Sequence, residues 1–241
     1  MQGRRQNSRY YKPPPLSYTS SDFTPDVGYG TGESLLLLLS GTSIPPPSTI
    51  TGITSLPAHH LRAQKRVAQF CVSPKSSTLP SVRLYQGDAV YRRSNFNEGH
   101  PLDPSSADIF DAVLALDCAY HFDTRETFLR QSFLKLAPAG RIALADICFD
   151  PQRLKSLPVW IVTRLFRLMP THNFVSTEGY RSQMEEIGFV DVQLEDITLD
   201  VFPGFISFLK SRGSGWMVFA WVLEWYFNAG AQFVLISGAV P

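Results

Sequence analysis

The sequence is poor in cysteine: its 241 residues include only Cys71, Cys118 and Cys148. These three are widely spaced and form no C-x-x-C pair, which excludes a disulfide framework and the usual spacing of a structural zinc site. No metal site is expected, because no further ligands stand at metal-binding spacing. The composition therefore favours a reducing compartment, and we expect a cytoplasmic protein.

An excess of charge of one sign is also lacking. The formal net charge is +1 at pH 7, and the sequence pI is near 7.7. Proteins that bind nucleic acid concentrate lysine and arginine to neutralise phosphates. Nucleic acid is therefore not an expected partner.

Long apolar runs are missing as well. The run Leu35–Leu39 is too short for the core of a signal peptide or for a membrane span, and it predicts a buried helix. The aromatic stretch 216–227 is also too short to cross a bilayer, and Glu224 interrupts it. We favour core packing beside the last strand for this stretch. Peripheral contact with a membrane and a dimer face are the alternatives.

The first 22 residues are basic, contain no acidic residue before Asp22, and include Pro13, Pro14 and Pro15. They predict a disordered leader or a truncated N-terminus. Mitochondrial targeting is the alternative, although the prolines argue against a long amphipathic helix.

Segments typical of strands and helices alternate along the remainder of the chain. Helices are predicted over 33–40, 59–70, from an Asp123 cap to residue 136, and over 178–187; strands are predicted over 49–56, 81–88, 110–117, 141–149, 189–199 and 230–240. With a short strand before residue 28, this alternation indicates an α/β fold. We expect a Rossmann-like, doubly wound and mostly parallel seven-stranded sheet with an antiparallel C-terminal edge.

The stretch D-V-G-Y-G-T-G, residues 26–32, places three glycines between the first strand and a helix. The spacing G-x-G-x-G differs from the G-x-G-x-x-G of dinucleotide-binding proteins, so a nicotinamide-dependent oxidoreductase is the weaker alternative. Glu33 in the first helical turn disfavours a pyrophosphate at this helix N-terminus. A ligand with a carboxylate, a ribose and a base would suit the position.

This stretch resembles the first motif of the class I S-adenosylmethionine-dependent methyltransferases. TGIT (51–54), QGDA (86–89), LDCAYHF (116–122) and KLAPAGRIALAD (135–146) follow in the family's order, so the resemblance covers roughly residues 26–150. TGIT is more similar to the branch of tocopherol, sterol and cyclopropane-fatty-acid methyltransferases. The resemblance implies a single methyltransferase domain over 23–241, with S-adenosylmethionine as the cofactor and a small, hydrophobic acceptor.

The resemblance also implies roles for individual residues. The methionine moiety and ribose would be held by Asp26 and by the backbone of Gly28, Gly30 and Gly32. Thr54 stands where most of the family has an acid for the ribose hydroxyls. Adenine would be recognised by Asp88 and the amide of Ala89, and the methionine amino group would lie beside Asp117 and Cys118.

Three features depart from the family pattern. Pro25 lies in the first strand, which we expect to be short. Few residues precede the first motif, where the family usually has covering helices. Ala139 replaces a glycine, which matters only if residue 139 needs a positive φ. These departures leave a second interpretation open, a non-catalytic or truncated relative that serves as an interaction module.

Methyl transfer by in-line displacement depends mainly on positioning, and an oxygen acceptor also benefits from a general base. His121 is the candidate base, and a purely structural role for it is the alternative. Tyr120, His121 and Trp160 are expected to line the acceptor pocket. The segment 151–176 is either a lid over the acceptor or an amphipathic helix on the sheet.

Overall fold

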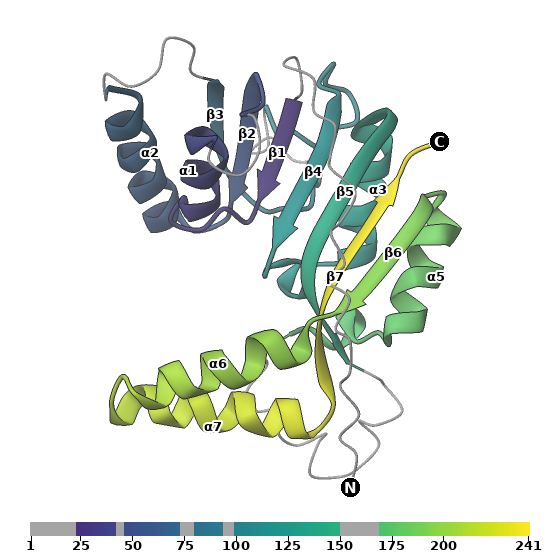
Figure 1. Ribbon diagram of the computed structural model, residues 1–241. Coiled ribbons are helices and arrows are strands. Elements are labelled where there is room, and N and C mark those ends of the chain that lie inside the picture. Colours follow the sequence, from purple (N-terminus) through teal and green to yellow (C-terminus); the bar gives the residue numbers. More distant parts are fainter. Residues whose placement is uncertain (1–22, 42–45, 73–79, 94–98, 150–168) are drawn as a thin grey trace, which may run out of the picture.

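The computed structural model describes residues 23–41, 46–72, 80–93, 99–149 and 169–241. Seven strands form one sheet in the order β3-β2-β1-β4-β5-β7-β6 (Figure 1). All neighbouring pairs are parallel except those of β7, which is antiparallel to both β5 and β6. The strands are β1 (Phe23–Val27), β2 (Thr49–Thr54), β3 (Ser81–Gln86), β4 (Phe110–Leu116), β5 (Leu136–Phe149), β6 (Val190–Asp196) and β7 (Ala231–Ala239). The predicted doubly wound fold is confirmed.

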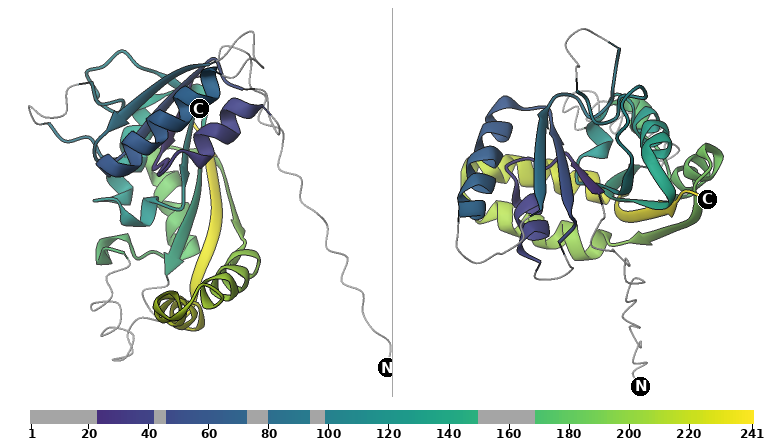
Figure 2. Two further views of the ribbon diagram at one scale, coloured as in Figure 1. Left: turned by 90° about the vertical axis from the view of Figure 1, so that its left-hand side faces the viewer. Right: turned by 90° about the horizontal axis from the view of Figure 1, so that it is seen from above.

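Helices pack on both faces of the sheet (Figure 2). One face is covered by α1 (Glu33–Ser40) and α2 (Pro57–Val72). The first of these helices buries three leucines there, and the second buries Ala63 and Val67. On the other face, α3 (Arg125–Lys135) and α5 (Thr177–Ile187) bury Phe128, Leu129 and Met184 against β4, β5 and β7. Burial on both faces explains why β4 reads as a continuous apolar run.

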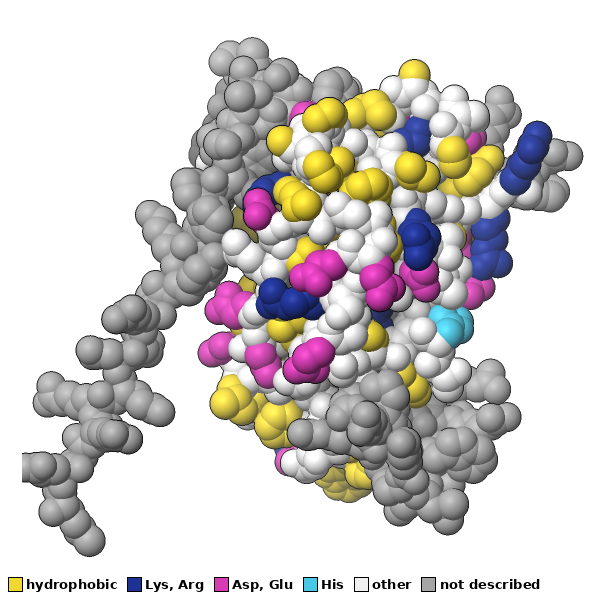
Figure 3. All heavy atoms as spheres, turned by 90° about the vertical axis from the view of Figure 1, so that its right-hand side faces the viewer, with side chains coloured by type: hydrophobic (Ala, Val, Ile, Leu, Met, Phe, Trp, Pro, Cys, Tyr) yellow, Lys and Arg dark blue, Asp and Glu magenta, His cyan; other side chains and the backbone are white. Residues whose placement is uncertain are grey.

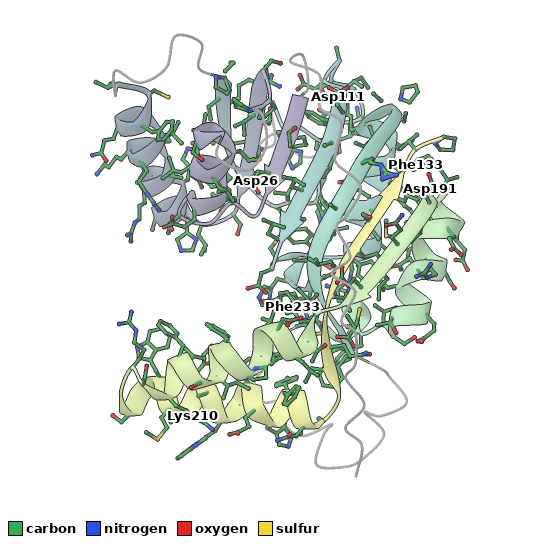
Figure 4. The ribbon with its side chains drawn as sticks, viewed as in Figure 1. Asp26, Asp111, Phe133, Asp191, Lys210 and Phe233 are labelled. Carbon is green, nitrogen blue, oxygen red and sulfur yellow. The ribbon has the colours of Figure 1, made fainter. Side chains whose placement is uncertain are left out.

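A hairpin of two helices, α6 (Thr198–Lys210) and α7 (Ser214–Asn228), joins β6 to β7. It projects from the body on the side where the carboxyl ends of β1, β2 and β4 lie (Figure 1). Near the tip of the hairpin, Lys210 forms an ion pair with Glu224 at 2.7 Å. At the base of the hairpin lies Phe233, in the first part of β7 (Figure 4). The aromatic stretch 216–227 lies within α7. It buries Ala220, Leu223 and Tyr226, but Trp216 and Trp221 stay more than half exposed.

Charged side chains are mixed in sign on the face formed by α5 and β6 (Figure 3). Elsewhere, Arg66 of α2 donates to both carboxylate oxygens of Glu33 in α1, at 2.6 and 2.8 Å. Among the described residues, none of the helices is long and apolar enough to cross a membrane.

One local prediction, the Asp123 cap, is wrong, and another, the short first strand, is confirmed. The N-cap of α3 is Thr124, whose hydroxyl accepts a hydrogen bond from the amide of Thr127, whereas Asp123 pairs with Arg92. The first strand is short, as predicted: β1 has five residues and pairs with β4 only at Asp26 and Val27.

Ala139 adopts a positive φ of 63°, which L-residues with a Cβ disfavour. Its amide donates to the carbonyl oxygen of Val240 at 3.1 Å, which fixes the backbone in this conformation. The alanine at this position, where the family usually has glycine, therefore carries a conformational cost, because residue 139 does need a positive φ.

We expect Ala139→Gly to stabilise the protein by about 1 kcal/mol, since relief of the left-handed strain exceeds the added backbone entropy of the unfolded chain. Thermal unfolding would show a rise in Tm of about 2–4 °C. Ala137→Gly, in the same strand but at a negative φ, should lower Tm. Equal effects of the two changes would contradict this account.

Candidate functional site

Most of the predicted site residues lie at the carboxyl edge of the sheet, where four hydrogen bonds join the end of one strand, or the turn that follows it, to a neighbouring strand. The amide of Gly28 donates to Ile53 O at 2.8 Å, and that of Gly87 donates to Thr54 O at 2.9 Å. The thiol of Cys118 donates to Val27 O at 3.2 Å, and the amide of Asp117 donates to Ala145 O at 2.8 Å. The turns after β1, β2, β3 and β4 therefore form one continuous edge, the usual ligand position in such sheets.

The three glycines after β1 all have positive φ, but their missing side chains serve different purposes. A Cβ on Gly28 would lie 2.5 Å from Cys118 Sγ, so this glycine lets β1 and β4 approach each other. A Cβ on Gly32 would crowd Ala63 of α2 at 3.1 Å. Space beside Gly30 is open, since the nearest atom would be Gly28 O at 3.9 Å. Of the three, Gly30 is the one whose bare backbone faces room for a ligand.

Asp26 is 1% exposed, and its Oδ2 has no hydrogen-bond partner among the described residues. It lies on β1, the strand that leads into the glycine turn (Figure 4). Burial raises the pKa of its carboxyl to about 6, while a hydrogen bond from Ser34 opposes the shift. A buried carboxylate oxygen without a partner is costly, and a cationic group of a ligand would satisfy it.

Asp88 is exposed at the turn after β3, and its Oδ1 accepts a hydrogen bond from the amide of Val90 at 2.9 Å. Beneath it lies His100, which is 1% exposed and which the sequence analysis missed. The amide of Leu102 donates to Nδ1 of His100, so Nε2 carries the hydrogen and donates to Asp88 O at 2.9 Å. Ala89 is buried beside this turn.

The turn after β4 contains the 3-10 helix η1 (Ala119–His121). The hydroxyl of Tyr120 donates to Asp117 Oδ1 at 2.9 Å, and the rings of Tyr120 and His121 pack with centroids 4.2 Å apart. Burial raises the pKa of the Cys118 thiol well above its usual value, so this thiol stays protonated. Loss of solvation lowers the pKa of His121, which favours the neutral imidazole near pH 7.

An apolar cavity of about 20 Å³ lies where η1, the end of β5 and the helical hairpin meet. Its walls are Tyr120, Ile147, Phe149, Met169, Phe202, Leu223, Tyr226 and Ala231. Tyr120, one of the residues predicted for the acceptor pocket, lies in this cavity wall, whereas His121 does not. Trp160 and most of the predicted lid, 151–168, lie outside the described residues.

The turn at Gly28–Gly32 is also tied to α2, a contact that sequence analysis missed. Tyr29 Oη lies 2.7 Å from His60 Nδ1, and Arg66 donates to Thr31 O at 3.2 Å. Within the described ranges, no group of three or more histidine, cysteine, aspartate or glutamate side chains is arranged to hold a metal ion.

Comparison with known proteins agrees with this geometry. Residues 26–194 match the family described as "Methyltransferase domain". Erythromycin 3''-O-methyltransferase of Saccharopolyspora erythraea is 28% identical over 76% of this chain and 55% of its own length, and O-methyltransferase resE of Aspergillus sclerotiorum is 27% identical over 78% and 62%. The chain therefore spans less than two thirds of the length of either relative.

A solved structure shows the same fold. It is the geranyl diphosphate C-methyltransferase from Streptomyces coelicolor A3(2), in complex with Mg²⁺, geranyl diphosphate and S-adenosyl-L-homocysteine. The TM-score is 0.67 at 18% identity, and the alignment covers 92% of this chain and 73% of the other. The family match spans the whole carboxyl edge described above, from Asp26 through the turn after β4. The chain belongs to the methyltransferase-domain family.

Proposed function

We propose that this chain transfers the methyl group of S-adenosylmethionine to an oxygen atom of a small, apolar acceptor. The observation that carries the proposal is the double role of Tyr120. Its hydroxyl donates to Asp117 at the edge where the cofactor is expected, and the same residue lines the apolar cavity. Tyr120 would thus border both the cofactor and the acceptor.

The described residues fit the cofactor. When bound, S-adenosylmethionine supplies a methyl group activated by a positively charged sulfur. The unpartnered Oδ2 of Asp26 would accept from the cofactor's ammonium group, the open space beside Gly30 would admit the ribose, and Asp88 would accept from the adenine amine. Asp117 and Cys118 would lie beside the methionine moiety, with Thr54 and Gly32 supporting the turns around it.

The acceptor is proposed to be apolar because the cavity beside Tyr120 presents apolar surface. Such walls favour a lipophilic group over a charged one. An oxygen acceptor is supported by the two relatives described above, both of which are named O-methyltransferases. The cavity is much smaller than a typical ligand pocket, so it would take one end of the acceptor.

His121 would act as the general base. Its neutral imidazole, favoured by the lowered pKa, can take the hydroxyl proton as the new bond from oxygen to methyl carbon forms and the sulfur–carbon bond breaks. The role is supported by the ring contact between His121 and Tyr120, because Tyr120 lines the cavity. Positioning of the two reactants would supply the remainder of the rate enhancement.

Isothermal titration with S-adenosylmethionine tests the proposal first. The wild type should bind, and Asp88→Asn should weaken binding by about tenfold, because one charge-assisted contact to adenine is lost. The amide side chain of this variant retains an oxygen for the amide of Val90, so Tm should change little. If a folded wild type fails to bind, the proposed function is wrong, and a non-catalytic or truncated relative is favoured. Preference for NAD in the same titration would favour an oxidoreductase.

The raised pKa of Asp26 gives a prediction for stability against pH. Its native pKa of about 6 exceeds the value of 3.8 for an unperturbed carboxyl, so its contribution to stability is complete below about pH 4 and is lost as the pH rises through 6. Asp26→Asn should therefore stabilise the cofactor-free protein above pH 6 by up to about 3 kcal/mol and have little effect at pH 4. Denaturant unfolding at both pH values measures this difference.

The same variant should lose most of its affinity for S-adenosylmethionine, because the partner of the ammonium group is gone. Glu195→Gln removes an equal charge from an exposed position on β6 and should affect neither stability nor binding. An Asp26→Asn protein that is less stable than the wild type at pH 7 would contradict the account of this carboxyl.

His121→Gln should lower kcat by about 100-fold with an acceptor identified by screening lipophilic phenols, alcohols and sterols, because a general base is removed. The affinity for S-adenosylmethionine should not change. The wild-type rate should rise with pH to a plateau below neutral, since the pKa of His121 is lowered, and this rise should be absent in the variant. Equal pH profiles would show that His121 is structural.

A further inference from the structure

A buried polar network lies directly behind the turn after β4. Its members are Arg125, Asp146, Asn173 and Tyr180, each no more than 2% exposed. Oδ2 of Asp146 accepts from the Arg125 guanidinium at 3.0 Å and from the Tyr180 hydroxyl at 2.9 Å, and Oδ1 accepts from the amide of Ile147 at 2.9 Å. The guanidinium also lies 4.6 Å from the centre of the Tyr180 ring.

Asn173, in the 3-10 helix η3 (Thr171–Asn173), connects this network to η1. Its Nδ2 donates to Tyr120 O at 3.0 Å and to Phe122 O at 2.7 Å, while its Oδ1 accepts from the amide of Arg125 at 3.0 Å. Arg125 in turn donates to the carbonyl oxygen of Asn173. One amide side chain thus uses both donors and its acceptor to hold the turn and the start of α3.

The backbone hydrogen bonds of η1 and the bond from Tyr120 to Asp117 also help to fix this turn. It is a single short turn, with backbone hydrogen bonds from His121 N to Cys118 O and from Phe122 N to Ala119 O. The Nδ2 group of Asn173 satisfies carbonyl oxygens at the end of this turn, on either side of His121. Loss of those donors would leave two carbonyls without these partners in a largely buried environment, which is costly.

We propose that Asn173 is a positioning residue that sets the conformation of η1, and thereby the placement of Tyr120 and His121 relative to the cofactor. The consequence for binding rests on the proposed function, whereas the conformational role does not. Asn173 lies about fifty residues beyond the turn in the sequence and reaches it through side-chain contacts alone. Arg125 holds Asn173 in place, because its guanidinium donates to the backbone carbonyl and its amide donates to Oδ1. Asp146 in turn fixes the guanidinium of Arg125.

The experiment compares Asn173→Ala with Ser176→Ala as a matched control. Ser176 caps α5 by accepting from the amide of Gly179 at 3.1 Å, so its removal should lower Tm by about 2–4 °C through loss of a helix cap. Asn173→Asp is a second test variant, because it keeps the volume and the acceptor for Arg125 but loses the two donors. Two quantities are measured for each protein: hydrogen exchange of the amides of residues 120–122, and affinity for S-adenosylmethionine by calorimetry.

Both Asn173 variants should exchange the amides of 120–122 about tenfold faster than wild type and bind S-adenosylmethionine about tenfold more weakly. Ser176→Ala should match wild type in both quantities despite its lower Tm. If the Asn173 variants show only the lowered Tm of the control, the positioning role is wrong. Should the wild type fail to bind the cofactor, the proposed function fails, and exchange at 120–122 still decides the role of Asn173.

Discussion

The buried ion pair between Arg125 and Asp146 is the interaction on which the arrangement of the site depends. Both side chains are almost fully withdrawn from water, and the cost of removing two charges from water is met only when every remaining polar atom is hydrogen-bonded. Tyr180, Asn173 and the amide of Ile147 supply those bonds. Because the partners come from α3, β5, η3 and α5, satisfying one ion pair fixes four elements relative to each other.

The predictability of the structure differs between its regular elements and its contacts. The alternation of strands and helices was visible because apolar periodicity is a local property, and the glycine turn was visible because positive φ selects glycine. The reason why residue 28 must be glycine could not be predicted from the sequence. Its missing Cβ accommodates Cys118, ninety residues later, and no local pattern records such a contact. His100 and Asn173 were missed for the same reason, since their hydrogen-bond partners Asp88 and Arg125 lie in other segments of the chain.

The helical hairpin shows a different kind of limit. A stretch that is largely apolar predicts burial, but only Ala220, Leu223 and Tyr226 of α7 are buried. Phe202, Leu223 and Tyr226 pack at the base of the hairpin, where they also line the cavity, whereas Trp216 and Trp221 remain exposed. Apolar composition therefore has two consequences here, a dry wall beside Tyr120 and an uncovered aromatic surface. The sequence alone does not show which apolar residues line the cavity and which form the exposed surface.

The position of β7 has a consequence for the order of assembly. In the described sheet β6 pairs only with β7, which lies between it and β5, although β6 precedes β7 in the chain. During synthesis β1 to β5 can pair as they emerge, but β6 and the hairpin must wait without a strand partner until residues 231–239 follow. Until then one edge of β5 and the apolar base of the hairpin are exposed together, so this interval is when the nascent chain is most open to aggregation and to chaperone binding.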